Sequence, residues 1–213
     1  MSNIKKLEAV TKALEDLCDS TPENPLSLIK TIEKATRLET GSPISEFLSN
    51  PDFIRKLINV GYRYESDEKV LEQVLWSLGQ ISGRVFWSMR QLYNEFEANT
   101  QDIYNFFLQF INHDNNKIRL AVATGFIKLP QFDEYPNKWN YIISMASIPP
   151  KIKSMRLFRW VVNANIKNIP SEFKYPICKI LNEYLHESNL DIDTQKLYKE
   201  IIVQLDDNFL EGV

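Results

Sequence analysis

The stretch NHDNNKIRLAVATGFIKLP, residues 112–130, most constrains the fold of this chain. After a polar turn, apolar side chains recur at the helical period, at Ile118, Ala121, Val122, Gly125, Phe126 and Leu129. This spacing predicts a helix with one apolar face. Pro130 should end it, because proline has no N–H and disfavours helix in the residue before it. A single amphipathic helix cannot bury its own apolar face, so other helices must cover it.

Segments of the same kind fill most of the sequence, separated by proline, glycine and capping signals. We expect helices at 3–19, 26–39, 43–48, 51–61, 67–82, 84–97, 100–111, 114–129, 136–145, 149–162, 171–186 and 194–206. Gly41 should close the second, and Gly83 should break or kink the helix 67–82. Pro176 should kink the helix 171–186 or begin it, and Asp193 should cap the last helix. No stretch alternates apolar and polar residues over strand length, so the predicted class is all-α.

Composition argues against several functional classes, although it leaves room for a local basic patch. With six glycines in 213 residues, the chain is poorly suited to a glycine-rich phosphate site. Its net charge of −3 and pI near 5.6 argue against wholesale nucleic-acid binding. Cys18 and Cys178 are isolated at or near apolar helical positions, which favours reduced thiols in a cytoplasmic protein. We see no secretion signal and no apolar run of membrane-spanning length, so no membrane partner is expected.

Three segments share a layout: 65–81, 112–129 and 147–164. Each has a polar or proline-containing turn, a lysine followed by an apolar residue, and then a helix. Aligning Val70, Ile118 and Ile152 gives offsets of 48 and 34 residues. Two-helix repeats of about 40–47 residues are typical of HEAT and armadillo arrays. The first offset is wide for one repeat, so we expect an irregular unit or an extra helix between those segments.

The middle segment resembles the HEAT consensus through Asp114, Ile118-Arg119, Ala121 and Ala123. In such repeats the aspartate and arginine tie the inter-helix turns together. The resemblance implies a right-handed α-solenoid of antiparallel helix pairs, with about ten helices in one domain, 1–213. The clearest units span 50–165, and the tail 207–213 should be frayed. Such folds are mostly binding surfaces, so the resemblance names no chemistry.

A search for catalytic or metal-binding patterns finds none with support. The two histidines, His113 and His186, lie near helix ends and are far from any cysteine pair. Asp191 and Asp193 could form a metal pair, but they match a helix-start signal better. No nucleophile, phosphate-loop or zinc-protease motif occurs. We therefore expect no catalytic residue, no metal and no cofactor.

Two groups of side chains are candidates for binding a partner. Acidic and aromatic residues in loops and first turns form the larger group: Tyr62, Tyr64, Glu65, Asp67, Glu68, Glu72, Trp76, Asp133, Glu134 and Tyr135. Arg156 and Trp160 form the second, expected on the inner surface of the solenoid beside Trp76. Both tryptophans could instead be core residues, with the basic side chains on a solvated face.

These observations favour a monomeric, non-catalytic protein that binds another protein. Its size, acidity and lack of chemistry are similar to those of bacterial immunity proteins, which neutralise a toxin such as a nuclease. The acidic group would then oppose the basic face of the toxin and speed association. A HEAT-like nucleic-acid-binding protein or DNA glycosylase is the alternative from another class, although no catalytic acid can be matched. A scaffold protein is a third hypothesis.

Overall fold

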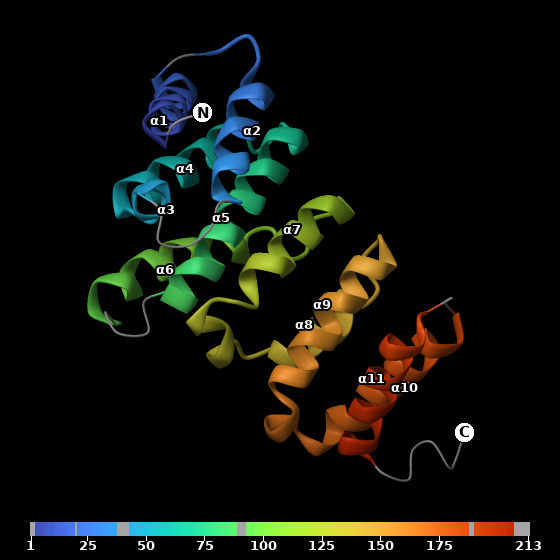
Figure 1. Cartoon of the computed structure of the whole chain (residues 1–213). Coiled ribbons are helices and arrows are strands. Elements are labelled where there is room, and N and C mark those ends of the chain that lie inside the picture. The colour runs from blue at the N-terminus through green and yellow to red at the C-terminus, as the bar shows by residue number, and fades with distance from the viewer. Residues whose placement is uncertain (1–2, 20, 38–42, 89–92, 188–189, 207–213) are drawn as a thin grey trace. The chain divides into compact units, whose positions relative to one another are not determined.

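The computed structural model describes residues 3–19, 21–37, 43–88, 93–187 and 190–206 (Figure 1). Within these ranges it consists of eleven α-helices and two short 3-10 helices, without any strand. The predicted all-α class is therefore confirmed. Gly41 and the tail 207–213 lie outside the described residues, so the expectations for them stay predictions.

The helices have the following bounds: α1 (Asn3–Asp19), α2 (Pro25–Thr36), α3 (Pro43–Leu48), α4 (Pro51–Arg63), α5 (Glu68–Ser88), α6 (Tyr93–Leu108), α7 (Asn116–Phe126), η1 (Pro130–Glu134), α8 (Lys138–Met145), α9 (Lys151–Ala164), η2 (Ile166–Asn168), α10 (Ser171–Glu187) and α11 (Ile192–Leu205). Several begin as the sequence predicts. Asn50, for example, caps α4 by accepting a hydrogen bond from the Asp52 N–H at 2.8 Å.

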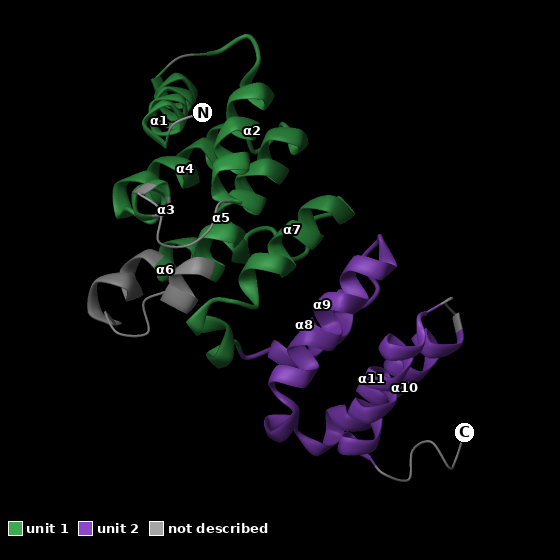
Figure 2. Cartoon of the chain, in the orientation of Figure 1, with its two compact units in different colours: residues 1–135 green, residues 136–213 purple. Residues whose placement is uncertain are grey.

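The chain divides into two compact units, residues 1–135 and 136–213 (Figure 2). The first contains α1 to α7 and η1, and the second contains α8 to α11 and η2. Each unit has its own apolar core, and each is described separately below. The single repeat domain expected over 1–213 stays a prediction.

Helix α5 is the centre of the first unit, where it contacts α2, α4, α6 and α7. Its inward side chains are fully buried: Val70, Leu71, Val74, Leu75 and Leu78. Burying an aliphatic side chain of this size contributes about 1.5–3 kcal/mol relative to leaving it exposed. Covering α5 on several sides therefore supplies much of the driving force for folding this unit.

Two glycines allow α5 and α7 to approach closely. A Cβ added to Gly125 would lie 2.6 Å from the Gly79 Cα and 2.6 Å from the Phe107 ring. A Cβ added to Gly79 would lie 3.0 Å from the Gly125 Cα. A Cβ at Gly125 does not fit at 2.6 Å from the Gly79 backbone, and one at Gly79 would be closer than nearly all real Cβ contacts, so the close approach of the two helices depends on these glycines.

Hydrogen bonds in the first unit join side chains to groups about one helix pair away. The Gln80 amide donates to Glu33 across 47 residues, and the Asn115 amide donates to Glu68 across 47. Arg63 donates to the Leu17 carbonyl across 46. These three bonds therefore join groups that lie 46 or 47 residues apart in the sequence.

Val70 in α5 and Ile118 in α7 are 48 residues apart in the sequence. Among the described residues, only α6 lies between α5 and α7. Helix α5 runs on to Ser88, and α6 covers parts of the two helices predicted at 84–97 and 100–111. The expected irregular unit or extra helix between the aligned segments stays a prediction.

Gly83 does not break α5, because one glycine in a helix costs only about 1 kcal/mol and burial on several sides outweighs it. A Cβ there would meet the Lys128 Cδ at 3.1 Å, so Gly83 lies against that side chain. Thr100 does not open a helix either. It is buried within α6, where its hydroxyl accepts a hydrogen bond from the Gln131 amide at 2.8 Å.

The second unit is built from α8, α9, α10 and α11. Helix α9 buries Met155, Phe158 and Val162, and the Met155 carbonyl accepts a hydrogen bond from the Tyr198 hydroxyl at 3.4 Å. That bond joins α9 to α11 across 43 residues. Burial raises the pKa of Tyr198 to about 12, so this hydroxyl stays protonated and remains a donor at neutral pH.

Two predicted helix starts in this unit need correction. Asp191, rather than Asp193, caps α11: its carboxylate accepts the Thr194 N–H at 2.8 Å and the Thr194 hydroxyl at 2.7 Å. These bonds favour the charged form and lower the pKa of Asp191. Pro176 does not begin α10, which starts at Ser171 and continues through it.

Candidate partner-binding surfaces

Two of the predicted acidic residues serve the local fold. The Asp67 carboxylate accepts hydrogen bonds from the N–H groups of Lys69 at 3.1 Å and Val70 at 3.3 Å, which caps the start of α5. The Glu68 carboxylate accepts a hydrogen bond from the Asn115 amide at 2.6 Å. Because Asn115 caps α7, this bond links the starts of α5 and α7. Both carboxylates remain exposed, as does Glu65.

The aromatic residues near the turn between α4 and α5 mostly make hydrogen bonds or ring contacts with neighbouring side chains. The Tyr62 hydroxyl accepts a hydrogen bond from the Gln109 amide at 2.7 Å, and its ring meets Phe106 edge-on. Tyr64 and Trp76 are half-buried. The Trp76 indole N–H donates to the half-buried Glu72 carboxylate at 3.4 Å. Tyr62 nevertheless remains 42% exposed, so its ring is the most accessible of these three aromatic side chains.

The remaining acidic residues are at the other end of α7. Asp133 and Glu134 are exposed in η1, which follows α7, while Asn115 and Glu68 meet at its start. Tyr135 packs its ring against Phe126, with the ring centroids 5.3 Å apart. Eleven helical residues separate the two ends, about 16 Å along the axis. The ten acidic and aromatic residues therefore do not form one continuous patch.

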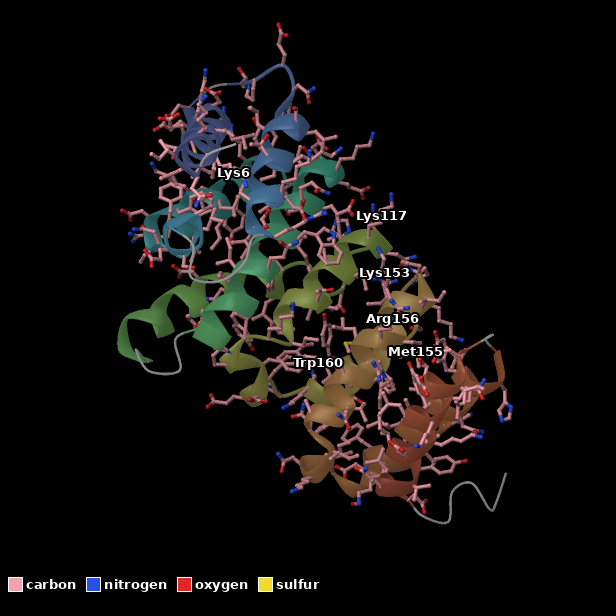
Figure 3. All side chains as sticks on the ribbon, viewed as in Figure 1. Lys6, Lys117, Lys153, Met155, Arg156 and Trp160 are labelled. Atoms are coloured by element: carbon pink, nitrogen blue, oxygen red, sulfur yellow. The ribbon has the colours of Figure 1, made fainter. Side chains whose placement is uncertain are left out.

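Helix α9 in the second unit carries a different kind of surface. Ile152 is 58% exposed and Trp160 is 46% exposed. Arg156, midway between them, is also exposed, and Figure 3 shows it beside Trp160 along the helix. Lys153 and Asn163 are exposed as well. At 100° per residue these five side chains fall within an arc of about 100°. We call them the α9 face.

The exposure of Ile152 corrects the sequence alignment, which places it inward with Val70 and Ile118. The buried arc of α9 is centred on Ser154, Met155, Phe158, Val161 and Val162. Ser154 fits there because its hydroxyl donates to the Ala146 carbonyl at 3.1 Å. Trp160 is likewise not a core residue. Arg159 turns away from the α9 face, since its guanidinium carbon lies 5.8 Å from the Tyr198 ring centroid.

The segment 136–171, which contains α8 and α9, carries only positive charges. From residue 136 to residue 171 the sequence has no Asp or Glu and six cationic residues: Lys138, Lys151, Lys153, Arg156, Arg159 and Lys167. Helix α9 has no acidic residue in its first turn. Lysines there oppose the positive end of the helix dipole, which costs stability. Exposed apolar side chains and unfavourable charges on one helix are departures typical of functional surfaces.

The surfaces described above are in different units. Arg156 and Trp160 belong to the second unit, whereas Trp76 and Gln80 belong to the first. Gln80 is half-buried, and its side chain accepts the Thr36 hydroxyl at 2.8 Å and donates to Glu33 at 3.0 Å. It therefore holds α2 against α5. The absence of Asp and Glu from 136–171 is a sequence signal that could have pointed to the whole α9 face.

Within the described ranges, no three His, Cys, Asp or Glu side chains gather as metal ligands would. His113 accepts a hydrogen bond from the Asn115 N–H at 3.0 Å, which is a turn contact. Among the helices that the structure describes, none combines the length and apolarity needed to cross a membrane. Searches against known protein families, curated proteins and solved structures find no match to this chain.

Proposed function

We propose that this chain is a non-catalytic helical-repeat protein that binds another protein. The repeat architecture is supported by the hydrogen bonds across 46 and 47 residues in the first unit and 43 residues in the second. These values are close to the 40–47 residues of HEAT and armadillo repeats. Stacked helix pairs of this kind form an α-solenoid, which offers a preformed surface to a partner.

One observation carries the binding proposal: Ile152, Arg156 and Trp160 are exposed together on α9. Tryptophan and arginine are enriched among the side chains that dominate protein interfaces. A helix holds them in place before the partner arrives, so little ordering entropy is lost on binding. The narrower hypothesis, an immunity protein that neutralises a toxin, stays a prediction.

Site-specific cross-linking tests this proposal. A photoreactive amino acid replaces Trp160 in one variant and Tyr175 in a second. Tyr175 is the matched control, because it is 64% exposed on α10 of the same unit. We expect one polypeptide to cross-link from position 160 and not from position 175.

That polypeptide is then purified, and its affinity is measured by calorimetry. Trp160→Ala should weaken binding at least about tenfold, equivalent to about 1.4 kcal/mol, and Tyr175→Ala should change it less than about twofold. Equal affinities for the two variants would overturn the proposal.

A further inference from the structure

We infer that the α9 face binds an acidic amphipathic helix of the partner protein. This inference rests on the proposed function and adds the chemistry of the partner. It follows from the charge, the apolar side chains and the helical spacing of the face.

The positive charge of the α9 face favours a negatively charged partner. Lys153 and Arg156 are exposed on the face, and the segment 136–171 that contains them has no acidic residue. A partner that covers Arg156 must supply an acceptor, because an unpaired charge removed from water is costly. A carboxylate can accept two parallel hydrogen bonds from a guanidinium, which makes it a well-matched partner.

The exposed apolar side chains of the α9 face favour a protein partner over a nucleic acid. Ile152, Arg156 and Trp160 form a stripe along the α9 face, with the exposed apolar side chains of Ile152 and Trp160 at its two ends. A tryptophan can stack on a base, but an isoleucine gains little from contact with a phosphate backbone. Apolar side chains on the partner would remove both residues from water.

The spacing of the stripe fits a helix. Ile152, Arg156 and Trp160 are separated by four residues each and span about 12 Å along the axis. An amphipathic helix presents apolar anchors at the same intervals, with acidic side chains beside them. About two turns of such a helix, at 5.4 Å per turn, would cover the stripe.

The test uses a labelled peptide of five turns (about 18 residues), built from Glu, Ala and Leu with the leucines on one face. A second peptide has the same composition in an order that scatters the leucines. Single-stranded and duplex DNA oligonucleotides complete the set. Binding to the full chain is followed by fluorescence anisotropy at low and at moderate salt.

We expect the amphipathic peptide to bind at least about tenfold more tightly than the scattered one, with an affinity that falls as salt rises. Arg156→Glu and Trp160→Ala should each weaken it about tenfold or more. Lys199→Glu and Tyr175→Ala are the controls, because both residues are exposed in the same unit outside the α9 face. Neither control should change the affinity more than about twofold.

Equal binding of the two peptides, tighter binding of DNA, or no effect of Arg156→Glu would each overturn the inference. The proposed function fails separately. If the cross-linked protein still needs Trp160 while the acidic peptide does not bind, the binding function stands and the partner chemistry is wrong. Circular dichroism of each variant confirms that loss of binding is not loss of fold.

Discussion

Helices α5 and α9 begin with similar sequence patterns but differ in how they are covered. Helix α5 contacts four other helices of its unit, and Leu75 and Leu78 are fully buried. Helix α9 has a buried side at Met155 and Phe158, while Ile152 and Trp160 remain exposed opposite it. A helix covered on several sides serves the core. A helix that keeps apolar side chains exposed is available to another molecule.

The largest expected difference between these helices is in the cost of truncating an apolar side chain. Leu75→Ala in α5 should lower the free energy of unfolding by about 2–5 kcal/mol, because it leaves a cavity in a fully packed core. Ile152→Ala in α9 should change it by less than about 1 kcal/mol. Urea denaturation followed by circular dichroism measures both. Similar losses would mean that Ile152 is structural and would contradict the distinction.

A smaller loss of stability is expected from a substitution at the contact between α5 and α7. Gly125→Ala should cost about 1–3 kcal/mol, because the new methyl group meets the Gly79 backbone and the Phe107 ring. Gly83→Ala is the control on the same surface of α5, since its nearest neighbour is the flexible Lys128 side chain. It should change stability by less than about 1 kcal/mol. Equal effects would show that the two backbones are not in close contact.

The contact between the starts of α5 and α7 should contribute still less to the free energy of unfolding. Asn115→Ala removes both the cap of α7 and the hydrogen bond to Glu68, so we expect a loss of about 0.5–2 kcal/mol. Asn112→Ala, an exposed change in the preceding turn, is the control. Denaturation of both variants measures the difference. No loss at Asn115 would remove this link from the account of the first unit.

The smallest expected contribution to stability comes from the Asp191 cap of α11 in the second unit. The hydrogen bonds from Thr194 lower the pKa of Asp191 below its ordinary value, so the charged form stabilises the fold. This contribution is present at neutral pH and is lost as pH falls through the lowered pKa. Wild type should therefore exceed Asp191→Ala in stability at pH 7, and the difference should shrink in acid. A pH-independent difference would contradict this mechanism.

Most of the secondary structure could be predicted, because amphipathic spacing and caps such as Asn50 are local signals. The errors arose where packing outweighs local preference. Gly83 continues a helix because α5 is covered on several sides, and Thr100 is buried because Gln131 satisfies its hydroxyl. Neither effect is visible from neighbouring residues in the sequence.

The candidate site was predictable only in part. Arg156 and Trp160 were identified from their residue types, but the exposure of Ile152 depends on which side of α9 its neighbours cover. Asp67 and Glu68 also have local roles that their sequence context did not reveal, because Asp67 caps α5 and Glu68 links α5 to α7; their role as partner contacts stays a prediction. Charge and residue type alone cannot separate these two roles, because a capping carboxylate also remains exposed.

Fluorine NMR of the chain labelled with 5-fluorotryptophan compares the two regions directly. The resonances of Trp76 in α5 and Trp160 in α9 are assigned by replacing each with phenylalanine. On addition of the protein identified by cross-linking, the Trp160 resonance should shift or broaden while that of Trp76 stays in place. A bound partner that leaves the Trp160 resonance unchanged would contradict the account.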